Sequence, residues 1–121
     1  MNYVEPHPLH EPIRQIDLQP VIQELWAQID EVKGGHTART LVKQDMFRVV
    51  LIAVKQGNRI PEHKVDGACS VQLLTGRAWI DFHGDRRELR PGQLLTIDTG
   101  IRHDVEAVED TCLLVTISML R

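Results

Sequence analysis

Residues 57–76 read GNRIPEHKVDGACSVQLLTG, and residues 92–107 read GQLLTIDTGIRHDVEA. Each stretch begins with a glycine, contains one histidine, and includes a run in which aliphatic and polar residues alternate. Short runs of this kind, bounded by Gly, Pro, Asn and Asp, are typical of antiparallel β-structure. The two stretches therefore predict strands and turns, with His63 and His103 as their candidate functional residues.

The same pattern extends over the rest of the chain from residue 36 onward. Val, Ile, Leu and Thr gather in short runs, and turn signals separate these runs at close intervals. We predict strands over residues 37–43, 46–55, 69–75, 77–82, 86–89, 94–97, 103–108 and 111–118. Residues 36–121 are thus expected to form one all-β barrel, and residues 1–35 to form an N-terminal arm and helix.

The N-terminal part has a different pattern. Three prolines within residues 1–17 favour an irregular arm, because proline and the residue before it are restricted to extended conformations. Residues 20–33 place apolar side chains at three- and four-residue steps, which predicts one helix. Pro20 suits the first helical position, and Gly34 suits the C-terminal stop.

The predicted strand 46–55 is apolar on both faces, since Val50 and Ile52 alternate with Val49 and Leu51. A strand of this kind is normally covered on both sides. One face is expected to line the barrel interior. The other needs a cover, either the predicted helix or a second subunit, and we expect a homodimer.

The two quoted stretches resemble the signature motifs of the cupin family of small β-barrels. Five residues separate Gly57 from His63, and two separate Gly100 from His103, as in the family motifs. The resemblance covers about residues 36–118 and is closest to small single-domain cupins of unassigned function. It implies a jelly-roll barrel, also called a double-stranded β-helix, and it supports the expected homodimer.

The resemblance also implies where a metal ion would bind. In metal-dependent cupins, two histidines and a glutamate of the first motif and the histidine of the second motif usually hold the metal. Here His63 and His103 match, whereas Val65 replaces the second histidine and Cys69 replaces the glutamate. Candidate ligands are therefore His63, His103 and Cys69. The ion would be a divalent transition metal: Zn or Cu if the thiolate binds, with Fe, Ni or Mn as other choices.

Two imidazoles alone are an incomplete metal site, because catalytic zinc sites have about three protein ligands. His63 and His103 could instead form hydrogen bonds in a pocket or in the core. Cys69 could equally be a small apolar filler. Beside it, we expect Val65, Val71 and Leu73 to line the pocket. Arg48 and Arg59 could also face this pocket and bind a carboxylate.

Three functions follow from these alternatives, and the sequence assigns no catalytic residue. The first is a barrel that binds a small-molecule ligand in a pocket marked by His63 and His103. The second is a metal-dependent enzyme, an oxygenase or isomerase, that uses these histidines and Cys69 as ligands. The third is a non-catalytic dimeric scaffold.

Composition and the absence of certain motifs argue against several other classes of protein. The net charge is −3 and aromatic residues make up 4% of the chain, which argues against nucleic-acid binding. There is no P-loop, no dinucleotide-binding glycine motif and no nucleophile elbow. The aliphatic run 49–54 is too short to span a bilayer, so we expect no membrane partner. Two cysteines without CxxC spacing, and no signal-peptide pattern, favour the cytoplasm.

Overall fold

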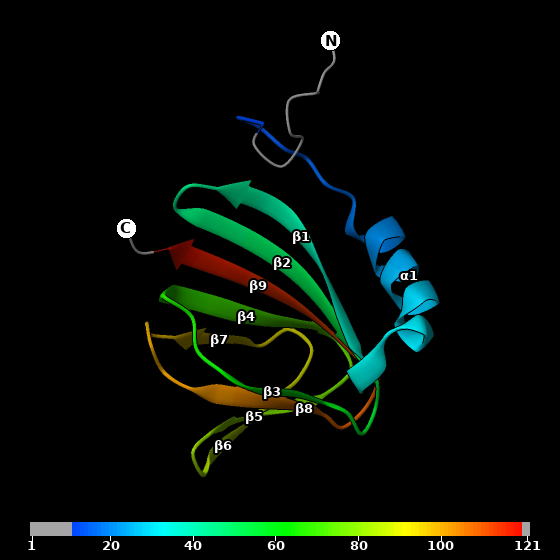
Figure 1. The fold of residues 1–121 in the computed structure, drawn as a ribbon, viewed down its shortest axis with the longest axis vertical. Helices are drawn as coiled ribbons and strands as arrows, with labels where there is room; N and C mark the ends of the chain where they lie inside the picture. Colours follow the sequence, from blue (N-terminus) through cyan, green and yellow to red (C-terminus); the bar gives the residue numbers. More distant parts are fainter. Residues whose placement is uncertain (1–10, 120–121) are drawn as a thin grey trace.

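The computed structural model describes residues 11–119, which form two antiparallel β-sheets packed face to face with one α-helix beside them (Figure 1). The larger sheet has the order β1-β2-β9-β4-β7 and the smaller sheet the order β3-β8-β5-β6. The larger sheet contains β1 (His36–Gln44), β2 (Phe47–Val54), β9 (Thr111–Met119), β4 (Gly67–Thr75) and β7 (Leu94–Ile97). The smaller contains β3 (Arg59–His63), β8 (His103–Ala107), β5 (Ala78–Phe82) and β6 (Asp85–Leu89). The predicted all-β class is confirmed, and the ends of the eight predicted strands differ from the observed ones by at most two residues.

Strand β3 is absent from the sequence prediction. It contains Pro61, which has no N–H for a ladder hydrogen bond and therefore argues against a central strand. The structure places β3 at the edge of the smaller sheet, where only one side needs a partner. Its pairing with β8 is irregular between Ile60 and His63, around the proline. The edge position and this irregularity together accommodate Pro61.

The helix is shorter than predicted and begins earlier. Helix α1 runs over Leu18–Gln28 and is followed by two 3₁₀ turns, η2 (Ile29–Glu31) and η3 (Lys33–Gly35). Pro20 is its third residue, a position whose N–H has no partner within the helix. Gly34 has φ 87° inside η3, a conformation that glycine adopts readily, and the chain then enters β1. Among residues 11–119, no helix is long and apolar enough to cross a membrane.

The predicted arm over residues 1–17 falls largely outside the described part of the chain. Residues 1–10 lie outside the described residues, and residues 11–17 contain no helix or strand.

Helix α1 covers the outer face of the larger sheet beside β1 and β2 (Figure 1). Leu25 is 1% exposed and belongs to an apolar cluster with Leu51 and Ala53 of β2. Glu24 of the helix pairs with Arg39 of β1 at 3.0 Å. The outer apolar face of β2 is thus buried by the chain's own helix, so this pattern needs no second subunit.

The inner faces of the two sheets enclose a second apolar cluster. Cys69, Val71 and Leu73 alternate with more exposed residues along β4 and are all buried. Across the space between the sheets, Ile80 of β5 and Val105 of β8 belong to the same cluster. The inner faces therefore surround the volume in which a pocket can form.

Candidate functional site

A cavity of about 220 Å³ lies between the two sheets. Inward-facing residues of β2, β3, β4, β5, β8 and β9, together with Val65, line it. The ionisable groups in its lining are the imidazoles of His63 and His103 and the thiol of Cys69, and the other lining side chains are aliphatic. The cavity is therefore an apolar chamber with a histidine pair in one part of its wall.

The β-ladder brings the two histidines together. His63 ends β3, His103 begins β8, and the two residues are direct partners in the antiparallel register. Their ring centroids are 4.3 Å apart, and the ring planes meet at 61°. Phe82 of β5 lies 5.8 Å from the His103 ring, centroid to centroid. Residues forty positions apart in the sequence thus share one site through strand pairing.

Backbone carbonyls fix the tautomer of both rings. The Nδ1 atom of His63 lies 2.9 Å from the carbonyl oxygen of Pro61, and that of His103 lies 3.0 Å from the carbonyl oxygen of Ile101. A carbonyl oxygen accepts hydrogen bonds only, so each Nδ1 carries the hydrogen and donates it. In a neutral imidazole the other nitrogen, Nε2, is then an acceptor. Both histidines therefore keep Nε2 available as an acceptor.

Burial sets the protonation of the site. His103 is 5% exposed, and this burial lowers the pKa of its imidazole below the usual 6.5. Nearby His63 lowers the pKa further, whereas the Ile101 carbonyl and Asp104 oppose the change. Burial also raises the pKa of the Cys69 thiol. At neutral pH the site therefore holds a neutral imidazole at His103 and a protonated thiol.

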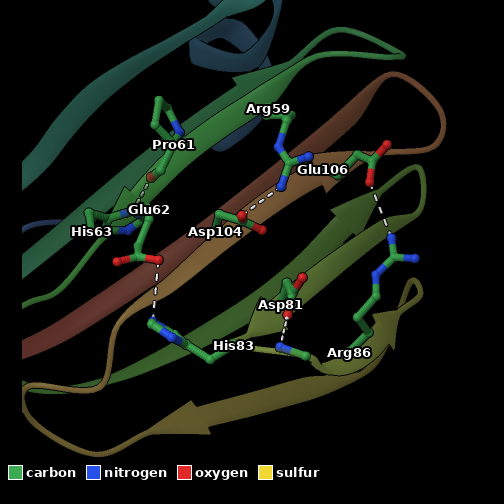
Figure 2. A network of polar contacts seen from close by, with 10 residues as sticks. Arg59, Pro61, Glu62, His63, Asp81, His83, Arg86, Asp104 and Glu106 are labelled. Atoms are coloured by element: carbon green, nitrogen blue, oxygen red, sulfur yellow. Dashed lines mark hydrogen bonds and ion pairs between the residues drawn. The ribbon is translucent and has the colours of Figure 1, made fainter.

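The outer side of the same strands carries a network of charged pairs (Figure 2). Arg59 of β3 pairs with Asp104 of β8 at 2.6 Å, and Glu62 of β3 lies 3.3 Å from the Nε2 atom of His83. These ion pairs join β3 to β8 and to the β5–β6 turn through Glu62 and Asp104, the sequence neighbours of the two site histidines.

The two arginines predicted to face the pocket lie elsewhere. Arg59 forms its ion pair on the outer face. Arg48 donates a hydrogen bond to the carbonyl oxygen of its preceding residue, and neither arginine lines the cavity.

Most predicted site residues lie around the cavity. Val65, Cys69 and Val71 line it with the two histidines. Leu73 lies on the same inner face of β4, but it is 1% exposed within the core and is not a lining residue. Sequence reasoning did not single out further lining residues on β3, β5, β8 and β9. These are Ile60, Ile80, Val105, Leu113, Val115 and Ile117. The two-residue alternation along strands β5, β8 and β9 was the signal that could have found most of them.

A larger hollow of about 460 Å³ is a weaker candidate site. It is lined mainly by small polar and apolar residues of β4, β7 and β9, and by Phe47. The cavity between the sheets contains both histidines and this hollow contains neither. Of the described residues that line it, Asp98 alone is charged.

The predicted metal-binding set is not brought together as a group of three ligands. Within residues 11–119, no group of three or more His, Cys, Asp or Glu residues is placed to hold a metal ion. His63, His103 and Cys69 all reach the cavity wall, but metal ligation by cysteine requires the thiolate, and burial opposes its formation. The donor groups present therefore do not fit a metal centre of the usual three- or four-ligand kind.

Comparisons with known proteins identify the architecture. The chain matches no family model and no curated protein sequence. Among solved structures, it is similar over 70% of its length to 78% of a cupin superfamily protein from Desulfitobacterium hafniense, with 19% identity and a TM-score of 0.68. It is similar over 100% of its length to 97% of a conserved protein of unknown function from Streptococcus pyogenes, with 22% identity and a TM-score of 0.69. A third similar structure is an RmlC-like cupin from Desulfovibrio desulfuricans, with 26% identity, a TM-score of 0.64, and coverage of 69% of this chain and 81% of the other.

Proposed function

Because this chain has the fold of the small cupin-superfamily barrels, we propose that it binds a small organic molecule in the cavity between its two sheets. One observation carries the proposal: the cavity of about 220 Å³ has aliphatic walls and two imidazoles. Pockets for small molecules are mostly apolar, with a few placed polar groups that fix the orientation of the ligand. His63 and His103 would be those groups.

The alternative of a metal-dependent oxygenase or isomerase has less support. It needs a third ligand beside the two imidazoles, and the described residues supply no such group. We therefore assign no reaction step to a metal ion in this chain.

Uptake of an apolar probe tests the proposed binding. Toluene, titrated into protein with ¹³C-labelled Val and Leu methyl groups, should shift the resonances of Val71, Val115 and Leu113, which line the cavity. The variant Val71→Phe fills part of the cavity and should lose these shifts. Val32→Phe makes the same change at a residue that is 41% exposed and outside the cavity, so it should bind toluene like the unmodified chain.

Folding of each variant is checked by its amide NMR spectrum, and Val71→Leu offers a milder filling if the phenylalanine is not accommodated. If neither toluene nor its hydroxyl-bearing analogue para-cresol shifts the cavity methyl groups, the proposal is refuted. Equal binding by the Val71→Phe and Val32→Phe variants would refute it as well.

A further inference from the structure

We infer that the ligand of this cavity is a neutral, mainly apolar molecule with a hydroxyl group, and that the hydroxyl donates a hydrogen bond to an Nε2 atom of the histidine pair. The inference rests on the proposed function, because it specifies the chemistry of a molecule bound in the same cavity.

The two histidines can accept hydrogen bonds from a ligand but have no N–H left to donate to one. Both Nδ1 atoms donate to backbone carbonyls, at 2.9 Å for His63 and 3.0 Å for His103. Each neutral ring therefore keeps a lone pair on Nε2. No hydrogen bond joins either Nε2 to another residue of the described part of the chain. The histidine pair thus offers acceptors, and a hydroxyl group supplies the matching donor.

The charge of the cavity wall favours a neutral ligand. Among residues 11–119, no Arg, Lys, Asp or Glu lines the cavity, so neither an anionic nor a cationic ligand would meet an opposite charge from these residues on its wall. Moving an unpaired ion from water into apolar surroundings costs far more than moving a hydroxyl group that finds an acceptor. A carboxylate also has no hydrogen to donate, so its oxygens would repel the lone pairs of the two Nε2 acceptors. These conditions favour an uncharged ligand.

The volume of the cavity limits the size of the ligand. An apolar cavity of about 150 Å³ is large enough to bind benzene. The cavity here measures about 220 Å³, which suits one ring with one or two small substituents. Such a ring would contact aliphatic residues such as Val71, Val115 and Ile117 while its hydroxyl group reaches the histidines.

Three matched ligands test this inference: para-cresol, toluene and para-methylanisole. They share a methyl-substituted ring; para-cresol has a hydroxyl, toluene has none, and para-methylanisole has an oxygen without a hydrogen to donate. Affinities are measured by the same methyl NMR titration. Para-cresol should bind about threefold to tenfold more tightly than toluene, the ratio that one net hydrogen bond provides, and more tightly than para-methylanisole.

Variants of the histidines supply a second test. In at least one of the variants His103→Phe and His63→Phe the preference for para-cresol over toluene should fall or reverse, because the acceptor has been replaced by an apolar ring; a preference kept in both variants would overturn the inference. His83→Phe is the matched control, since the His83 side chain is 62% exposed in the β5–β6 turn and lies outside the cavity. This control should keep the preference.

The outcomes separate the two proposals. If toluene binds in the cavity as tightly as para-cresol, or if para-methylanisole matches para-cresol, the hydroxyl inference is overturned while the proposed function stands. The comparison of the three ligands needs no variant, so it tests the hydroxyl inference even if His103→Phe does not fold. If none of the three molecules shifts the cavity methyl groups, the proposed function fails, and this inference fails with it.

Discussion

Replacing Leu25 by alanine tests how the larger sheet is covered. Leu25 is 1% exposed and lies in the apolar cluster that joins α1 to Leu51 and Ala53 of β2. A fully buried Leu→Ala change costs about 2–5 kcal/mol, because the transfer free energy is lost and a cavity remains. The near-complete burial of Leu25 between helix and sheet places the expected loss in the free energy of unfolding at about 3–4 kcal/mol.

The assay is urea unfolding followed by circular dichroism, together with the thermal midpoint. For a chain of this size, each kcal/mol shifts Tm by about 3–6 °C, so the expected fall is on the order of 10–20 °C. Leu94→Ala is the matched control, because Leu94 is 63% exposed. This surface change should alter the free energy of unfolding by less than about 0.5 kcal/mol.

A loss below about 1 kcal/mol for Leu25→Ala would mean that Leu25 is not buried between the helix and the sheet, because a buried Leu→Ala change does not cost so little. Sizing chromatography adds a second readout. If Leu25→Ala instead converted a dimer to monomers with little loss of stability, a second subunit rather than the helix would be covering β2.

Three other predictions follow from the structure. Gly76→Ala should lower the free energy of unfolding in urea by more than about 2 kcal/mol, because Gly76 has φ +91° and a Cβ there would lie 2.2 Å from the carbonyl oxygen of Asp110. Gly84→Ala is the control, since Gly84 has φ +98° but no atom within 4 Å of the added Cβ, and it should cost only about 1–2 kcal/mol. The free energy of unfolding should fall as the pH drops below about 6.5, because the lowered pKa of His103 makes the unfolded chain bind the proton first. The contribution of His103 to this fall ends below its folded-state pKa, so the fall should be smaller in His103→Gln, and identical pH profiles would contradict the assignment. Long-range ¹H–¹⁵N NMR at pH 8 should show hydrogen on Nδ1 and none on Nε2 in both His63 and His103, and Nε2-protonated rings would contradict the hydrogen-bond assignment.

The strands could be predicted from the sequence because their side chains alternate with a period of two. Along β4, Cys69, Val71 and Leu73 are buried and their neighbours are more exposed, as the pattern indicates. Strand β3 could not be predicted in this way, because Pro61 removes a ladder donor and only the tertiary arrangement shows that β3 is an edge strand. The sequence also left open what buries the outer apolar face of β2, since a helix and a second subunit can bury apolar residues equally well.

The candidate site could be predicted only in part. The motif positions of His63 and His103 predicted that both lie at one pocket, and the β3–β8 register places their rings side by side. The available Nε2 atoms depend on hydrogen bonds from Nδ1 to backbone carbonyls, which no residue pattern specifies. Sequence also could not show that Leu73 belongs to the closed core, or that Arg59 pairs with Asp104 on the outer face.

A crystal structure of the protein grown with para-cresol would show whether the histidine pair binds a hydroxyl group inside the cavity. We expect electron density for one ring inside the cavity, among aliphatic side chains such as Val71 and Val115, with the hydroxyl oxygen within hydrogen-bonding distance of the Nε2 atom of His63 or His103. Histidine rings turned away from the cavity, or para-cresol bound only on the outer surface of the sheets, would contradict this expectation.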